Sequence, residues 1–403
     1  MGPEGVGSMH RGFVSPGTGL ARAAALVALV TLAGCSIFKP APEPVPVEPA
    51  KPKLAAPLAT HTFPFDPQTT GVLGELQVTF ASQEDTLPDI ARRFNLGFDE
   101  LVNANPGVDP WLPGEGTRIV LPTQFVLPDA PHEGVVVNLA ALRMFYFPKP
   151  GPDGQRVVIT YPIGIGKVGW ATPEGATKIV SKRKDPYWTP PASVRKEHAA
   201  EGDPLPARVP PGPDNPLGNR AMNLGWPSYL IHGTNKPAGV GLRASHGCIR
   251  MYPEDVLLLF DMVAVGTKVT VVNQPIVYRW QGDSLYVQSY PPHEELLEAK
   301  SKKNAAAAAV HTHLDKKLAA KITKRAEPHG GAIDWTVTDQ VISDARGVAV
   351  PVSRPGITYD AFVAAARQVE NTLPAGANWD GRDGEEESAS TTTGTPGGNA
   401  GGR

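Results

Sequence analysis

The segment 134–147 (GVVVNLAALRMFYF) constrains the fold most, because two apolar runs rich in β-branched and aromatic residues flank a short interruption at 138–141. This pattern predicts a β-hairpin. Further strands are predicted at 157–161, 178–180 and 268–272, which are rich in β-branched residues. The chain therefore holds a domain that is built mainly of β-strands.

One helix is predicted within this domain. Residues 253–265 begin with a proline and two acidic residues and stop before Gly266, as helices often do. The fold class predicted for 132–273 is mainly β, sandwich-like with one main helix. The Pro-rich segment 181–220 is too long for a simple turn, and we predict that it covers a site.

A smaller unit is predicted at 75–122. A strand at 76–80 leads to two short helices, the first capped by Asp85-Thr86, and a strand at 117–121 closes the unit. This small β-α-α-β unit resembles a LysM module, which implies binding to the glycan strands of peptidoglycan. Glu84 stands where many such modules have glycine. The alternative is a packing unit that does not bind glycan.

The N-terminal region has the pattern of an exported protein. Arg11 and Arg22 precede an apolar run at 23–33, which is short for a membrane span and typical of a signal peptide. Residues 1–34 are therefore predicted to be a signal peptide. The Pro-rich stretch 35–62 is predicted to be an extended tether.

The first of the two cysteines ends this apolar run. The sequence LAGC at 32–35 resembles the lipobox of bacterial lipoproteins, which implies that Cys35 is lipidated. Ser36 follows Cys35, and by resemblance to Gram-negative sorting rules this implies an outer-membrane anchor facing the periplasm. The alternative is a plain signal peptide with an incidental cysteine.

The residues that can carry chemistry lie at 231–256 (IHGTNKPAGVGLRASHGCIRMYPEDV). A thiol nucleophile needs a base, and His232 could approach Cys248 across a loop. Gly233 and Gly247 let the backbone come close to a substrate, and the amides of Gly247 and Cys248 could stabilise an oxyanion. Spacing alone leaves the alternative of an inert buried cysteine and a core histidine.

Three motifs carry a family resemblance: HGTN at 232–235, SHGCIR at 245–250 and MYPED at 251–255. Together they resemble the L,D-transpeptidase (YkuD-fold) family. The resemblance extends over about 63–292 and is to the Gram-negative enzymes that join a LysM-like module to this domain. It implies a periplasmic enzyme that acts on peptidoglycan stem peptides.

The resemblance also implies residue roles. Cys248 would attack the amide before the terminal D-alanine of a stem tetrapeptide and form a thioester. His232 would take the thiol proton, and the carbonyl of Gly233 could orient the imidazole. For Arg250 and Arg243 the alternative to substrate binding is a structural ion pair. For Tyr229 and Trp226 the alternative is a place in the core. The residues implied to shape the nucleophile loop or bind substrate are Ser245, His246, Gly247, Arg250, Arg243, Tyr229 and Trp226.

Three acceptors are compatible with this resemblance. An amine of a second stem peptide would give a 3–3 cross-link, a lysine of an envelope lipoprotein would attach that protein to the wall, and water would make the enzyme a carboxypeptidase. A non-catalytic wall-binding tether is the alternative from another class. No metal or cofactor is predicted, because the histidines lack ligand spacing. Gly164, Gly166 and Gly169 match a dinucleotide-binding pattern, but WATP at 170–173 argues against the helix that this pattern needs.

The remaining sequence is low in complexity. The 42 glycines and 43 prolines concentrate in linkers and tails. Residues 274–299 are predicted to be a trailing segment, and 300–403 a largely disordered tail, with a solvated helix within 300–324 and weak docking within 333–372. The formal net charge of −2 gives no basic surplus, so no nucleic-acid partner is predicted.

Overall fold

The computed structural model describes residues 54–58, 61–302, 310–330, 332–354, 356–375, 377 and 379–380. The chain divides into Met1–Pro52 and Lys53–Arg403, and everything described below belongs to the second unit. The predicted signal peptide, Cys35 and most of the predicted tether lie outside the described residues. Among the described helices, none is long and apolar enough to cross a membrane.

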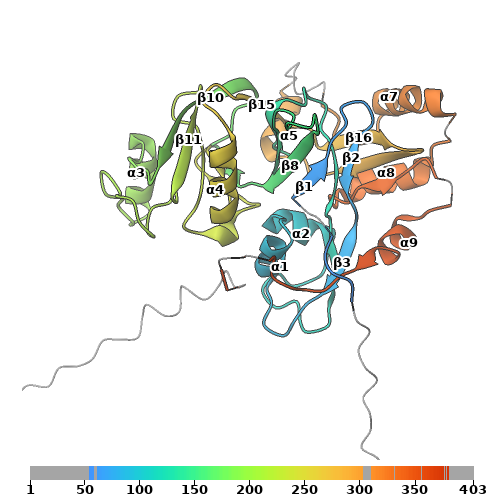
Figure 1. The fold of residues 1–403 in the computed structure, drawn as a ribbon, viewed down its shortest axis with the longest axis horizontal. Helices are drawn as coiled ribbons and strands as arrows, with labels where there is room; N and C mark the ends of the chain where they lie inside the picture. Colours follow the sequence, from blue (N-terminus) through green and yellow to red (C-terminus); the bar gives the residue numbers. More distant parts are fainter. Residues whose placement is uncertain are drawn as a thin grey trace, which may run out of the picture. The chain divides into compact units, whose positions relative to one another are not determined.

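The largest element is a nine-stranded sheet with the order β1-β8-β7-β6-β15-β10-β11-β12-β14. The predicted hairpin is confirmed, since β6 and β7 pair antiparallel from Gly134 opposite Phe147 to Asn138 opposite Arg143. The predicted helix is also confirmed as α4 (Pro253–Met262; Figure 1). The strands of the sheet are β1 (Thr62–Pro64), β6 (Gly134–Asn138), β7 (Arg143–Phe147), β8 (Val157–Pro162), β10 (Gly175–Lys184), β11 (Arg220–Leu224), β12 (Leu230–His232), β14 (Ile249–Arg250) and β15 (Lys268–Val272).

The long strand β10 curls this sheet. Its first residues pair with β15 and its last residues pair with β11, and the register shifts between Ile179 and Ser181. An irregularity of this kind bends a strand and increases its twist. The two ends of the sheet therefore enclose one core together with α4, with Val137, Ile231 and Leu259 all buried in it. The predicted sandwich-like packing takes the form of a single curled sheet.

Strands β6 and β7 are buried on both of their faces. Side chains alternate along a strand, so Val135 and Val137 enter the core with α4, while Val136 enters a second core. The second core is shared with the small unit, whose Leu87 and Phe94 pack there. The uninterrupted apolar runs of the predicted hairpin follow from this double coverage.

The small unit consists of β3 (Gln77–Phe80), α1 (Leu87–Arg93), α2 (Phe98–Ala104) and β4 (Arg118–Leu121). Below it is called the module. The order of elements agrees with the predicted plan, and Thr86 caps α1 in a capping box with Asp89. Arg92 of α1 forms a two-pronged ion pair with Glu254 at the start of α4, at 2.9 and 2.8 Å. Two short strands next to the module, β2 (Val72–Gly74) and β5 (Gln124–Val126), pair antiparallel.

The C-terminal region differs from the predicted tail. The prediction of a largely disordered region from 300 onward is wrong for the described residues after 310, which form helices and strands (Figure 1). Apolar residues at helical spacing, such as Leu318 and Ile322, pack with Leu285 and Val120 in a third core. The elements are β16 (Ile276–Gln281), β17 (Ser284–Ser289), α5 (Glu294–Ser301), α7 (Lys316–Ala326), α8 (Trp335–Asp344), β18 (Val350–Pro351), α9 (Tyr359–Ala364) and β19 (Arg367–Gln368).

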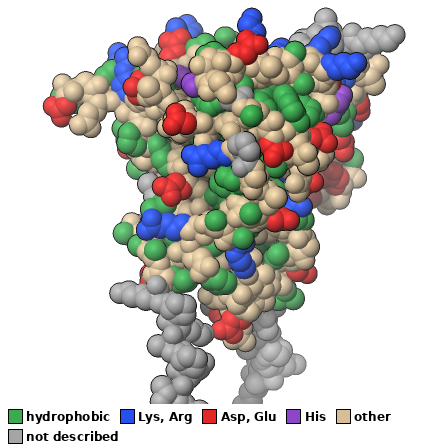
Figure 2. Space-filling model, turned by 90° about the vertical axis from the view of Figure 1, so that its right-hand side faces the viewer, with side chains coloured by type: hydrophobic (Ala, Val, Ile, Leu, Met, Phe, Trp, Pro, Cys, Tyr) green, Lys and Arg blue, Asp and Glu red, His purple; other side chains and the backbone are tan. Residues whose placement is uncertain are grey.

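Each of these C-terminal elements is short and buries few residues by itself, which explains why the sequence pattern alone did not reveal them. Strand β18 joins the antiparallel pair β16–β17, and β19 adds to β3 of the module in parallel. The predicted solvated helix corresponds in part to α7, which has a buried apolar face. On the face of the molecule in Figure 2, acidic and basic side chains are interspersed, in keeping with the near-neutral net charge of −2.

Candidate active site

The two predicted catalytic residues come from neighbouring strands. Strands β12 and β14 pair in parallel, with Ile231 opposite Ile249 and His232 opposite Arg250. Both isoleucines are buried in the core with α4. Because side chains alternate along a strand, His232 and Arg250 leave the sheet on the other face, together with Cys248 just before β14. The register therefore places an imidazole, a thiol and a guanidinium on one face.

His232 is buried and has a defined tautomer. Its Nδ1 lies 2.6 Å from the carbonyl oxygen of Gly233. A carbonyl oxygen only accepts hydrogen bonds, so Nδ1 carries the proton and Nε2 is the basic nitrogen. Burial, helped by the positive charge of Arg250, lowers the pKa of His232 to about 3. The imidazole is therefore neutral at neutral pH and can accept a proton.

Cys248 is half-buried, and its Sγ lies 3.6 Å from the carbonyl oxygen of Ser228. Burial raises the pKa of this thiol, while a backbone hydrogen bond from Leu230 and the charge of Arg250 oppose the rise. The resting pair is thus a neutral thiol and a neutral imidazole. A neutral thiol can become a nucleophile by passing its proton to a neutral imidazole.

Two hydroxyl groups hold the nucleophile loop, residues 245–248. Ser245 Oγ donates to the carbonyl oxygen of Cys248 at 2.6 Å and accepts from the Gly247 amide at 3.2 Å. Thr172 Oγ1 donates to the Gly247 carbonyl at 2.9 Å and accepts from the Gly166 amide at 3.1 Å. Gly247 has a φ of 97°, which favours glycine. Thr172 has no local sequence signal for this role, because it lies 75 residues before Gly247 in the chain.

The Gly247 amide was predicted to be an oxyanion donor. In this structure it donates to Ser245 Oγ through a long hydrogen bond of 3.2 Å. Tyr229 covers the same glycine, since a Cβ at Gly247 would lie 2.8 Å from Tyr229 Cε1. Trp226 packs edge to face against Tyr229, with ring centroids 6.4 Å apart. Tyr229 thus lies at the nucleophile loop, and Trp226 supports it.

His246 turns toward the segment that was predicted to cover a site. That segment contains α3 (Ala192–Ala200), whose Glu197 accepts from His246 Nε2 at 2.9 Å and from Lys167 Nζ at 2.6 Å. The rings of Trp170 and His246 also pack edge to face, at 4.9 Å between centroids. Glu197 and Lys167 were missed by the sequence reading, because only the fold brings them to the loop.

The two arginines have different surroundings. Arg250 has a buried Nε for which no partner is found among the described residues, and burial lowers its pKa. Arg243 lies in β13 (Arg243–Ser245) and interacts with Asp99 of the module. Burial raises the pKa of Asp99 to about 6, and the charge of Arg243 opposes the rise. Arg250 therefore belongs to the face with Cys248, whereas the charge of Arg243 acts on Asp99 of the module.

Comparison with known proteins gives the family of this chain. The model of the L,D-transpeptidase catalytic domain family (YkuD) matches residues 132–271. The probable L,D-transpeptidase ErfK/SrfK of Salmonella typhimurium is 36% identical over 304 residues, which cover 73% of this chain and 93% of that protein. The probable L,D-transpeptidase YcfS of Escherichia coli is 43% identical over 228 residues, covering 55% and 70% of the two chains.

A third relative, the probable L,D-transpeptidase YbiS of Escherichia coli, is 42% identical over 235 residues, which cover 57% of this chain and 75% of that protein. The chain belongs to the L,D-transpeptidase family. The family relationship supports a transferase that acts on peptidoglycan.

Proposed function

We propose that this protein is a cysteine L,D-transpeptidase that forms a thioester with a peptidoglycan stem tetrapeptide. The tautomer of His232 carries this proposal. Since Nδ1 donates to Gly233, Nε2 is the nitrogen that can take the Cys248 proton on the shared face of β12 and β14. Burial keeps the imidazole neutral at neutral pH, so Nε2 has a lone pair that can accept the thiol proton.

The first half-reaction follows from these groups. His232 Nε2 takes the proton from Cys248 Sγ as sulfur attacks the carbonyl carbon of the amide before the terminal D-alanine. The carbon–nitrogen bond then breaks, the imidazolium protonates the amine, and D-alanine leaves. The amide of Cys248, and that of Gly247 once it leaves Ser245, would stabilise the oxyanion. Arg250 is proposed to bind a substrate carboxylate and Tyr229 to line the pocket.

In the second half-reaction an amine attacks the thioester and His232 takes its proton. The carbon–sulfur bond breaks as the new amide forms, and the imidazolium returns the proton to the Cys248 thiolate. The acceptor is proposed to be a stem peptide, which gives a 3–3 cross-link, or a lysine of an envelope lipoprotein. The test is to incubate purified protein with disaccharide tetrapeptide, with and without a lysine-bearing peptide, and to identify the products by mass spectrometry. Cross-linked or peptide-linked products support transfer. Tripeptide alone would show hydrolysis, and no product would refute the proposal.

Glycan binding by the module is a second proposal, supported by two exposed apolar side chains. Trp111 is 58% exposed and Leu112 is 78% exposed, both after α2. The Trp111 ring is braced by Phe98, with centroids 5.8 Å apart. An exposed, braced indole is suited to stacking on a sugar ring. Trp111→Ala should weaken co-sedimentation with purified sacculi, and unchanged co-sedimentation would leave the module with a packing role only.

The lipid anchor is proposed from the sequence at 32–35. If Cys35 is lipidated, Cys35→Ala should move the mature protein from the detergent-extracted outer-membrane fraction to the soluble periplasmic fraction. Continued dependence on detergent after removal of the signal peptide would contradict the anchor.

A further inference from the structure

The first turn of α2 in the module contacts the chain segment that leads to the nucleophile. The Phe98 amide donates to the carbonyl oxygen of Val240 at 3.1 Å, and the Asp99 amide donates to that of Gly241 at 3.2 Å. The two backbones also touch, since a Cβ at Gly97 would lie 2.6 Å from the Cα of Gly241. Gly241 has a φ of 85°, so this turn needs glycine both for its conformation and for the close approach.

This segment continues directly into the nucleophile loop. The carbonyl of Leu242, next in the chain, accepts from the Ile165 amide at 3.0 Å. Strand β13 (Arg243–Ser245) follows and pairs with β9 (Ile165–Gly166). Ser245 at its end holds the carbonyl oxygen of Cys248 at 2.6 Å. The turn held by α2 is therefore connected through β13 to the backbone of Cys248.

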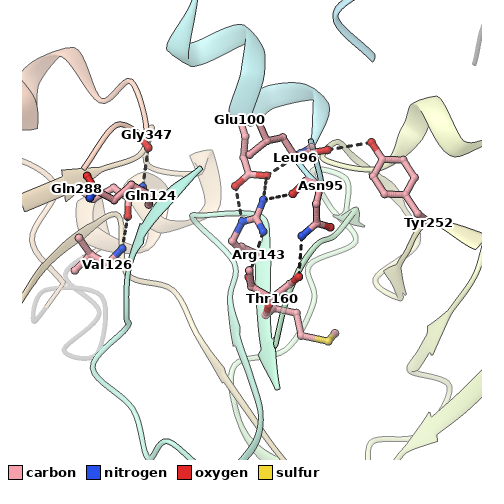
Figure 3. A network of polar contacts seen from close by, with 12 residues as sticks. Asn95, Leu96, Glu100, Gln124, Val126, Arg143, Thr160, Tyr252, Gln288 and Gly347 are labelled. Carbon is pink, nitrogen blue, oxygen red and sulfur yellow. Dashed lines mark hydrogen bonds and ion pairs between the residues drawn. The ribbon is translucent and has the colours of Figure 1, made fainter. Parts of the chain in front are cut away.

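The module can fix the position of the turn at Val240 and Gly241 because side-chain contacts hold it against the catalytic sheet. Figure 3 shows Arg143 of β7 with its guanidinium directed at Glu100 of α2, at 2.7 and 2.8 Å. The same view shows the Tyr252 hydroxyl, which donates to the carbonyl of Leu96 at 3.1 Å. Arg143 is fully buried, and the surrounding apolar core is common to the module and the sheet. The module is thus packed directly against the catalytic domain.

We propose that the module is a positioning part of the active site: the first turn of α2 holds the turn at Val240 and Gly241 and thereby sets the place of Ser245 and Cys248. This inference rests on the proposed role of Cys248 as the nucleophile. It assigns Gly97, Phe98 and Gly241 as positioning residues, which act through the backbone and do not touch the substrate.

The test compares Phe98→Pro with Phe98→Ala. Both variants lose the aromatic ring, but only proline also removes the N–H that donates to Val240. Phe98 is the first residue of α2, where proline is tolerated, and Gly97 before it is extended with a ψ of 164°. The acylation rate of Cys248 by tetrapeptide, measured per folded molecule, should be about 10- to 100-fold lower for the proline variant than for the alanine variant, at similar KM.

A second pair separates positioning from stability. Gly97→Ala brings a methyl group against Gly241 while its own φ of −93° suits alanine. Gly116→Ala strains another turn of the module, at a φ of 77°, with nothing within 4 Å of the new Cβ. Gly97→Ala should lower the acylation rate about tenfold, and Gly116→Ala should retain the native rate per folded molecule even where it lowers the melting temperature.

The rate of Cys248 alkylation by iodoacetamide provides a readout that does not depend on the substrate. This alkylation rate should differ between Phe98→Pro and Phe98→Ala, and between Gly97→Ala and Gly116→Ala. If each pair of variants shows equal acylation and alkylation rates per folded molecule, the positioning role is refuted. If the native protein has no turnover but the alkylation rates still differ within the pairs, the proposed function fails while the positioning of Cys248 stands.

Discussion

Two buried polar regions of this molecule differ in whether their titratable groups have oppositely charged partners. The positive charge of Arg143 is matched by the Glu100 carboxylate, which accepts two hydrogen bonds from the guanidinium. The guanidinium also donates to the Asn95 carbonyl at 2.8 Å and to the Thr160 hydroxyl at 3.2 Å. Figure 3 shows these partners converging on one guanidinium. Among the described residues, no ion pair of His232 or Cys248 is found, and burial favours the neutral forms of both the thiol and the imidazole.

The effect of burial on a titratable group depends on whether an opposite charge lies beside it. A buried ion pair with good geometry fixes two elements relative to each other, and losing one partner is costly. A buried acid or base without a matching charge shifts its pKa toward the neutral form and keeps its hydrogen-bonding capacity for a substrate. The first region joins the module to the sheet, and the second is suited to chemistry.

The sharpest test of the second region is Cys248→Ala. Turnover of tetrapeptide should fall by at least about 10⁴-fold, because the attacking atom is lost. Thermal unfolding should change little, since a half-buried thiol contributes little to packing. Product analysis by mass spectrometry and a melting curve measure the two effects. Retention of a few per cent of native turnover would assign the chemistry to another residue.

His232→Ala should lower turnover by about 10²- to 10⁴-fold through loss of the base. Because burial raises the pKa of the Cys248 thiol above its usual value, its alkylation rate in the native protein should keep increasing as pH rises through the alkaline range. Near neutral pH, Cys248 of the His232→Ala variant should be alkylated more slowly than Cys248 of the native protein. A rate that is already constant from mildly acidic pH upward would instead mean a thiolate–imidazolium pair, and the contrast between the two regions would be lost.

Arg143→Met tests the matched region. It leaves the Glu100 carboxylate buried without its partner, so the free energy of unfolding should fall by about 3–5 kcal/mol. Urea unfolding measures the loss. The double variant Arg143→Met with Glu100→Leu removes both charges and should recover much of the stability. Equal losses in the single and double variants would show that packing of the side chains, and not the charge pair, holds the two elements together.

Asp255→Asn gives the smallest expected effect. Asp255 of α4 is buried, one carboxyl oxygen has no partner among the described residues, and burial with the nearby charge of Glu254 raises its pKa well above the usual value. Since the folded pKa exceeds the unfolded one, the native protein should lose stability as pH rises from the unfolded value of about 4 toward the folded value, by at most about 1.4 kcal/mol per pH unit.

Asparagine cannot ionise, so this part of the pH dependence should be absent in Asp255→Asn. Urea unfolding of both proteins at mildly acidic and at mildly alkaline pH gives the difference in slope. The native protein is the more destabilised of the two at the higher pH if Asp255 is an unmatched acid. Parallel slopes would place Asp255 with the matched charges.

Local sequence by itself determined several parts of this protein. The hairpin at 134–147, the capped helix after Thr86 and the helix after Tyr252 each depend on contacts between residues close in the chain, and each is present in the structure. The motifs that contain His232 and Cys248 were also sufficient to indicate, by resemblance, the L,D-transpeptidase family to which the chain belongs.

Only the tertiary structure decided the rest. The ordered C-terminal region forms because short segments such as α7 and α8 bury their apolar faces against strands from elsewhere in the chain. Thr172 and Glu197 reach the nucleophile loop from distant parts of the sequence, so no local pattern could reveal them. The joining of the module to the sheet likewise depends on Arg143 meeting Glu100, a pair that becomes neighbours only when both faces of the sheet are covered.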